Sequence, residues 1–147
     1  MQTLHEKFRG LGEAVDQNQA KHLPRVLIIE DTLLIAMLLD ELVRECGCEI
    51  AQVASDLESA RRAVARRDYD AVLLDIGLDA GKSFDIADVL LERGVPFAFV
   101  TAYHDILEPR YRKVPIVSKP FSSTLLMNTV NSLVQFADQP QQCRSCA

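Results

Sequence analysis

From Arg25 onward, short apolar runs alternate with amphipathic stretches of helical spacing, five times in succession. The apolar runs lie at residues 26–29, 49–54, 71–74, 97–100 and 114–117. Runs that are apolar at nearly every position are typical of parallel strands buried on both faces. Their alternation with helical patterns predicts an α/β fold, in which a five-stranded parallel sheet is doubly wound by helices.

The helical segments differ in the strength of their signals. The first helix is expected to end near Gly47. It is expected to bury an apolar stripe along one side, which consists of Leu33, Leu34, Met37, Leu38, Leu42 and Val43. Residues 103–113 are poor in apolar side chains and are interrupted by Pro109, so only a short fourth helix is expected there.

Capping residues set the expected ends of the other helices. Ser55 and Glu58 have the spacing of a capping box for the second helix. Ser83 is expected to cap the third helix, and Gly94 occupies the position favoured after its last turn. Ser122 is expected to cap the last helix.

Length and composition indicate one domain. A chain of 147 residues, 48% of them hydrophobic, is long enough for one well-buried core and short for two. We expect a polar N-terminal extension at 1–23, the domain at 24–137 and a flexible tail at 138–147. The extension carries a helical stripe, Leu4, Phe8, Leu11 and Val15, although Gly10 and Gly12 weaken it. A loosely packed leader is favoured over a dimerising or partner-binding helix.

Charge and hydropathy exclude several classes of protein. A net charge of -5 argues against nucleic-acid binding. The arginine pairs at 61–62 and 66–67 are interpreted as an exposed helix face. No apolar run is long enough for a membrane span and no signal peptide is evident, which predicts a soluble, cytoplasmic protein.

The four cysteines are expected to stay reduced in that compartment. They are Cys46, Cys48, Cys143 and Cys146. A four-thiolate zinc site is a less favoured alternative, because Cys-x-Cys is not the usual ligand spacing.

Polar residues follow four of the expected strands. Glu30 and Asp31 follow the first, Asp75 the third, Thr101 the fourth and Lys119 the fifth. The carboxyl ends of parallel strands meet at one edge of a sheet, where open α/β folds bind their ligands. Each residue alone is more typical of a turn or a cap, but the five together predict a site.

These side chains suit a divalent metal and a phosphoryl group. Glu30, Asp31 and Asp75 supply the oxygen ligands that Mg²⁺ prefers. Asp75 also has the position of a nucleophile that forms an aspartyl phosphate. Lys119, the Thr101 hydroxyl and the Ala102 backbone N–H are then the candidates that stabilise phosphoryl oxygens.

With these motifs, residues 25–136 resemble the receiver domain of two-component response regulators. The resemblance implies a flavodoxin-like fold with strand order 2-1-3-4-5. It implies that Asp75 accepts a phosphoryl group from a phosphohistidine, on a sensor histidine kinase or a histidine phosphotransfer protein. Asp31, Asp75 and the Gly77 carbonyl would bind Mg²⁺ directly, and Glu30 through water. The Lys119-Pro120 peptide would be cis.

Two positions, Ile116 and Glu30, depart from the common receiver pattern. Ile116 stands where many receivers carry the aromatic residue that reports phosphorylation. The segment at 99–103, FVTAY, is similar to the Phe-Ala-Thr-Gly-Tyr motif of a subgroup of alphaproteobacterial regulators, which makes Tyr103 the candidate switch ring. Glu30 replaces the commoner aspartate and is expected to tune metal affinity.

The favoured function is a stand-alone phosphorylation switch that signals through a downstream protein, because the chain ends just after the fifth helix. We expect no turnover of an external substrate and no contact with nucleic acid or membrane, and a homodimer remains open. The alternatives are a phosphate sink for a shared kinase and an interaction module that works without phosphorylation. An aspartyl phosphatase is disfavoured, since 30–32 reads Glu-Asp-Thr rather than Asp-x-Asp.

Overall fold

The computed structural model describes residues 23–78, 83–103 and 108–137. Five parallel strands form one sheet in the order β2-β1-β3-β4-β5. They are β1 (Arg25–Ile29), β2 (Glu49–Ala54), β3 (Ala71–Leu74), β4 (Phe97–Thr101) and β5 (Ile116–Ser118). The predicted α/β class and strand order are confirmed.

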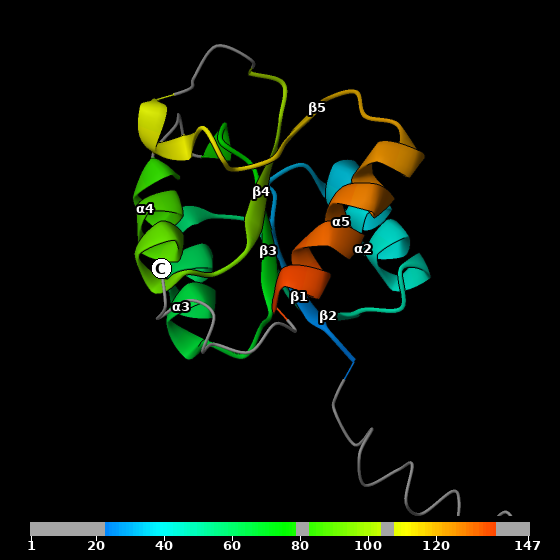
Figure 1. Cartoon of the computed structure of the whole chain (residues 1–147), viewed down its shortest axis with the longest axis horizontal. Helices are drawn as coiled ribbons and strands as arrows, with labels where there is room; N and C mark the ends of the chain where they lie inside the picture. Colours follow the sequence, from blue (N-terminus) through cyan, green and yellow to red (C-terminus); the bar gives the residue numbers. More distant parts are fainter. Residues whose placement is uncertain (1–22, 79–82, 104–107, 138–147) are drawn as a thin grey trace, which may run out of the picture.

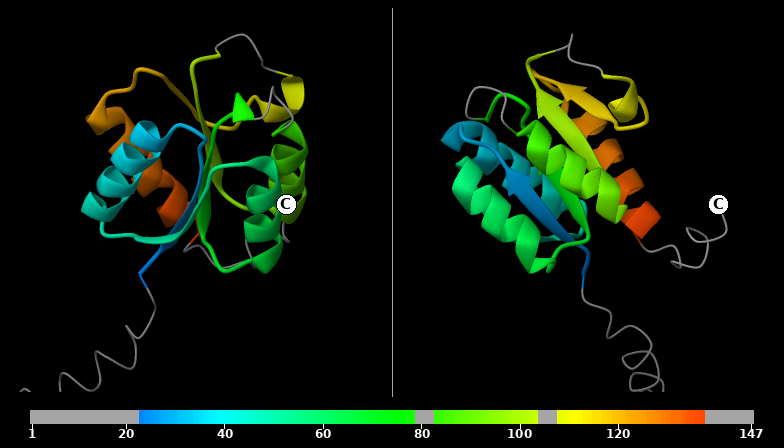
Figure 2. Two further views of the ribbon diagram at one scale, coloured as in Figure 1. Left: turned by 180° about the vertical axis from the view of Figure 1, so that it is seen from behind. Right: turned by 90° about the vertical axis from the view of Figure 1, so that its left-hand side faces the viewer.

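Helices cover both faces of the sheet. Figure 1 shows α3 (Leu57–Arg66) and α4 (Phe84–Arg93) on one face, and α2 (Leu33–Glu45) and α5 (Ser123–Ala137) on the other. The two views in Figure 2 show the same sandwich from behind and from the side. The core is therefore divided by the sheet into two apolar clusters, one under each helix pair.

Strand β1 shows why its sequence is apolar at successive positions. Leu27 and Ile29 pack in the cluster beneath α3 and α4, whereas Val26 and Ile28 pack in the cluster beneath α2 and α5. Successive side chains of a strand point to opposite faces, and here both faces are covered. All four side chains are 1% exposed or less.

The buried face predicted for α2 is wrong in its N-terminal half. Leu33, Leu34, Met37 and Leu38 are exposed, with Leu33 at 72% and Leu34 at 77%. The buried residues are Ala36, Leu39, Leu42 and Val43. This helix is apolar on nearly every side in its first two turns, so helical periodicity alone did not determine which side faces the sheet.

Two predicted caps are confirmed and two need correction. Gly94 ends α4 in the left-handed conformation with φ 68°, and the Leu125 backbone N–H donates to Ser122 Oγ at 3.0 Å. The box predicted from Ser55 and Glu58 lies one residue later. There, Ser59 N donates to Asp56 Oδ1 at 2.7 Å, and Asp56 N donates to Ser59 Oγ at 3.4 Å.

The shift of the box has a structural cause in β2. Ala54, the last residue of β2, still pairs with Ile29, and Glu30 N donates to its carbonyl at 3.0 Å. Ser55 is therefore the residue at which the chain leaves the sheet, and the N-cap of α3 is the next residue, Asp56. Ser83 occupies the N-cap position of α4 but makes no side-chain cap; its hydroxyl donates to the Ile76 carbonyl at 2.8 Å.

The connection between β4 and β5 contains the short helix that the sequence predicts, the 3-10 helix η2 (Pro109–Tyr111). Its Tyr111 is fully buried and stacks on Phe84, with ring centroids 5.5 Å apart. Burial raises the pKa of Tyr111 to about 12, so its phenol keeps the proton that it donates to the Asp88 carboxylate. This aromatic side chain fills the space between β4 and α4.

Strand β5 begins at Ile116, two residues later than predicted. Pro115 precedes it and has no backbone N–H for the ladder, which explains the late start. The four arginines at 61–62 and 66–67 are exposed, as predicted. Within the described residues, no helix combines the length and apolar character needed to cross a membrane.

Several predictions concern residues outside the described ranges. The stripe from Leu4 to Val15 lies there, as do Cys143 and Cys146. Of the other two cysteines, Cys48 is buried, and Cys46 Sγ donates to the Met127 carbonyl at 3.7 Å.

Candidate functional site

Residues that are far apart in sequence converge at the carboxyl edge of the sheet. The Lys119 ammonium, after β5, donates to Glu30 Oε1, after β1, and lies 3.4 Å from Asp75 Oδ2, after β3. Glu30 and Asp75 are 1% and 7% exposed. The topology places the ends of β1 and β3 side by side, which brings these two carboxylates together.

Asp31 completes an acidic cluster with Glu30 and Asp75. One carboxylate oxygen from each of the three residues lies within 4.8 Å of the others. Asp31 is exposed, and its backbone N–H donates to Glu30 Oε2 at 3.1 Å. Three hard oxygen donors, two of them buried and one open to solvent, fit Mg²⁺, which binds few carboxylates and keeps several waters.

The electrostatics of the cluster also suit a cation. Burial, followed by the hydrogen bond and the negative charge of Asp75, raises the pKa of Glu30 to about 7, although Lys119 acts in the opposite direction. The single positive charge of Lys119 therefore does not offset the negative charge of the three carboxylates. A divalent ion at these oxygens would favour the ionised form of Glu30.

We predict that Mg²⁺ affinity depends on pH through Glu30. Below its pKa of about 7 the folded protein holds a proton on Glu30 that Mg²⁺ has to displace, so affinity is expected to rise as pH increases from 6 to 8. Titration calorimetry at several pH values measures this. Glu30→Gln is expected to flatten the dependence, and an unchanged slope in that variant would contradict the assignment.

The end of β4 is tied to the end of β5. Thr101 is fully buried, its hydroxyl oxygen accepts a hydrogen bond from Tyr103 N at 3.0 Å, and its carbonyl accepts one from Lys119 N at 2.8 Å. Ala102 is exposed at the start of the same loop. The Lys119-Pro120 peptide is cis, as the resemblance implies. Ile116 is half-buried and pairs with Phe99 across β4 and β5.

Two contacts around Asp75 carried no signal in the sequence. The Gly77 backbone N–H donates to Asp75 Oδ1 at 2.9 Å and thereby holds the carboxylate. The Tyr103 ring, 57% exposed, lies over this turn: a Cβ atom on Gly77 would be 3.0 Å from Tyr103 Cε2. The sequence had suggested both residues separately, but only the fold places them in contact.

We predict that Gly77→Ala displaces the Tyr103 ring with little loss of stability. The added methyl is too close to a ring carbon, but an exposed side chain can rotate away. The expected result is a change in the Tyr103 ring signals in NMR and a loss of about 1 kcal/mol or less in the free energy of unfolding. Unchanged ring signals would show that the ring does not rest on Gly77 in solution.

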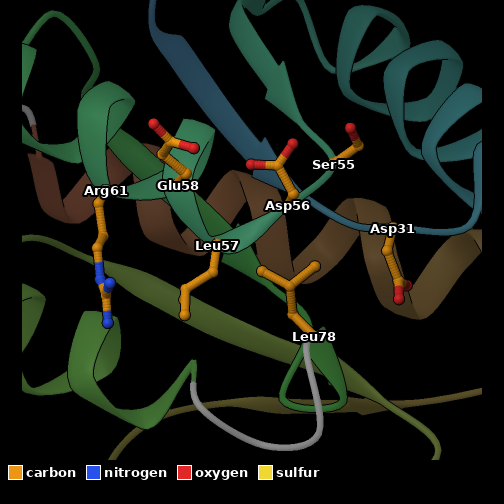
Figure 3. Close-up of a pocket in the computed structure, with 7 residues that line it drawn as sticks. All are labelled: Asp31, Ser55, Asp56, Leu57, Glu58, Arg61 and Leu78. Carbon is orange, nitrogen blue, oxygen red and sulfur yellow. The ribbon is translucent and has the colours of Figure 1, made fainter.

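A cavity of about 530 Å³ adjoins the acidic cluster (Figure 3). Asp31 forms one wall, Leu78 lies at its base, and Asp56, Glu58 and Arg61 come from the start of α3. Glu30, Asp75 and Lys119 do not line it. The cavity therefore borders the site through Asp31 and leaves that carboxylate accessible from the α3 side.

The sequence matches the family model of the response regulator receiver domain over residues 26–131. The chain belongs to this family. It is 33% identical over 116 residues to the transcriptional regulatory protein PdtaR of Mycobacterium tuberculosis; the match covers 75% of the chain. The chain spans only 56% of that relative's length.

Solved receiver structures show the same fold. The solution structure of the receiver domain of PhyR from Erythrobacter litoralis has a TM-score of 0.70 and 37% identity, covering 82% of this chain and 97% of that one. The BeF3-activated conformation of SdrG from Pseudomonas melonis has a TM-score of 0.65 and 30% identity, covering 78% and 98%. The fold and family implied by the strand-end residues are thus confirmed.

Proposed function

We propose that this receiver domain accepts a phosphoryl group on Asp75, with Mg²⁺ as its cofactor, and signals through protein partners. The observation that supports this most directly is the position of Lys119, whose ammonium contacts both Glu30 and Asp75 beside a three-carboxylate cluster. Asp75 follows β3, the central strand of the sheet, and its Oδ1 accepts a hydrogen bond from Gly77 N. In this proposal the domain itself is the substrate of the phosphoryl transfer, and it does not turn over an external substrate.

Each residue has a role in the proposed transfer. An Asp75 oxygen forms a bond to phosphorus while the P–N bond of a phosphohistidine breaks, and the electron pair stays on the imidazole nitrogen. Gly77 N orients the carboxylate through Oδ1, and Lys119 lies on the side of Oδ2. The Thr101 hydroxyl and Ala102 N–H are the proposed donors to the other phosphoryl oxygens.

The acidic residues would hold the metal. Asp31, Asp75 and the Gly77 carbonyl are the proposed direct ligands, with Glu30 acting through water. Bound Mg²⁺ offsets the repulsion between an anionic nucleophile and an anionic phosphoryl donor. The buried Glu30 carboxylate, with its raised pKa, supports this placement.

The exposed apolar face of α2 supports a protein as phosphodonor. Leu33 and Leu34 lie in its first turn, two and three residues after Asp31 in the chain, and Leu125 of α5 is 48% exposed. An apolar surface bordered by a reactive carboxylate suits a transient protein contact. We propose that a histidine kinase or a histidine phosphotransfer protein binds here in the cytoplasm.

We predict that Leu34→Asp slows phosphotransfer from such a protein at least tenfold. Leu34 is 77% exposed in the free domain, and the substitution puts a charge where the proposed complex has an apolar contact. Phosphorylation by a small-molecule donor is expected to be unchanged, since Leu34 does not contact Asp75. Leu23→Asp is the control, because this side chain is 54% exposed and precedes β1, at the opposite edge of the sheet from Asp31. Equal slowing with both donors would contradict a docking role.

The output is proposed to be a switch in the region of 103–121, which contains Tyr103 and Ile116. Thr101 links that region to the site, because it bonds to both Tyr103 N and Lys119 N. A ligand that interacts differently with two states shifts the equilibrium between them. The similar SdrG has been solved in a BeF3-activated conformation, which supports an activated state here.

The test is intact mass after incubation with a small-molecule phosphodonor, with and without Mg²⁺. We expect a gain of one phosphoryl group that depends on the metal, together with altered amide exchange at 108–121. No gain in mass would favour the module that works without phosphorylation. A gain that decays rapidly and leaves amide exchange unchanged would favour the phosphate sink.

A further inference from the structure

A second cleft lies at the amino edge of the sheet, away from the acidic cluster. Its volume is about 420 Å³, within the range of roughly 300–1,000 Å³ typical of ligand sites. Its lining is mainly apolar and comes from the end of α4, the starts of β4 and β5 and the last turns of α5. The residues that matter here are Leu91, Val95, Phe97, Val114 and Leu133.

The described part of the connection between β4 and β5 places little bulk beside this cleft. Within the described residues, that connection holds only the three-residue helix η2. Tyr111 fills the space next to Phe84 and Phe99, but Val95 and Val114 are left only half-buried. Leu91 is 37% exposed at the rim. The cleft is therefore an apolar surface without a full cover in the described part of the chain.

The chain enters the domain at the same edge. Leu23 is 54% exposed and precedes β1, whose start lies at the same edge of the sheet as the last turn of α5 (Figure 1). In the strand order, β4 is two positions from β1 and β5 is three. These separations correspond to about 10 and 14 Å.

The segment at 4–15 has the composition to occupy the cleft. Leu4, Phe8, Leu11 and Val15 recur at the spacing of one helix side. The seven residues between Val15 and Leu23 span at most about 25 Å, more than the distance to β5. In contrast, residues 138–147 contain no Leu, Ile, Val, Met or aromatic residue. The exposed residues of α2 line none of the cavities described above.

We propose that the N-terminal segment at 4–15 docks into this cleft of its own domain through Leu4, Phe8, Leu11 and Val15. Docking covers Leu91, Val95 and Val114, and it fixes a segment whose two glycines make it a poor helix in isolation. The contact does not depend on phosphorylation of Asp75. The segment would become available to other proteins only on release from the cleft.

Amide exchange in the full-length chain tests this. Residues 4–15 are expected to exchange at least tenfold more slowly than a free peptide of the same sequence. Leu91→Asp should abolish this protection, whereas Leu38→Asp on α2, at a side chain of similar exposure, 42%, should preserve it. Phe8→Asp should abolish it as well and shift the NMR amide signals of Val95, Phe97 and Val114.

Three results would overturn the proposal. One is exchange of 4–15 at the rate of the free peptide. The second is loss of protection in Leu38→Asp but not in Leu91→Asp, which would place the segment on α2. The third is protection that increases with protein concentration, which would identify a second copy as the partner. If Leu91→Asp does not fold, Phe8→Asp decides alone, since it alters only the segment.

Discussion

Asp75→Asn is expected to abolish phosphorylation of this protein by a small-molecule donor in the presence of Mg²⁺. The amide has nearly the shape of the carboxylate but lacks the anionic oxygen that attacks phosphorus. The amide would keep an oxygen that accepts the hydrogen bond from the Gly77 N–H, so the fold should persist. The expected loss is at least a hundredfold in the rate of phosphoryl incorporation, measured by intact mass.

Asp85→Asn is the matched control. Asp85 is an aspartate whose side chain is 77% exposed on α4, with only a 3.8 Å ion pair to Arg61, and its substitution should leave incorporation unchanged. Phosphorylation that persists in Asp75→Asn would mean that another residue accepts the group. Peptide mapping of the product would then identify that residue, and the proposed role of Asp75 would fail.

Tyr111→Ala is expected to cost about 3–5 kcal/mol in the free energy of unfolding. The side chain is fully buried, stacks on Phe84 at 5.5 Å and meets Phe99 edge-on at 5.4 Å. Its removal leaves a cavity between β4 and α4 and takes away the hydrogen bond to Asp88. The Arg110 guanidinium, 4.9 Å from the ring centroid, loses its contact with the ring but keeps its ion pairs with Asp88 and Glu108. Urea unfolding followed by circular dichroism measures the loss.

Tyr103→Ala provides the comparison for Tyr111→Ala. The Tyr103 ring is 57% exposed, so its loss should change the free energy of unfolding by about 0.5 kcal/mol or less. Two tyrosines eight positions apart in the same connection should thus differ severalfold in their effect. A similar cost for both would show that η2 is not a fixed part of the core.

The strands, and the edge of the sheet that carries the site, could be predicted because their sequence patterns lie within short segments. Residues 26–29 and 71–74 are apolar at every position, which suits a strand covered on both faces and little else. Once parallel strands are assumed, Glu30, Asp75 and Lys119 have to meet at one edge, and the contacts of Lys119 with both carboxylates agree with this. The remaining site roles are predictions that the experiments above test.

Other features were not local and were mispredicted or missed. The buried side of α2 was assigned to Leu33 and Leu34, because several apolar stripes fit the same helix and only packing against the sheet selects one. The capping box moved by one residue because the pairing of Ala54 with Ile29 extends β2. The contact of Tyr103 with Gly77 joins the ends of two different strands, and no spacing in the sequence encodes it.

The sequence by itself determined the fold class, the order of elements and the five residues at the carboxyl edge, since hydrophobic periodicity and strand-end chemistry are properties of short segments. The tertiary structure decided which side of α2 is buried, how Lys119 is shared between Glu30 and Asp75, and that burial raises the pKa of Glu30 to about 7. It also decided that a cleft remains at the starts of β4 and β5, beside a connection whose described residues form the short helix η2. Burial, shared contacts and cavities arise between segments, and they exist only once the chain has packed.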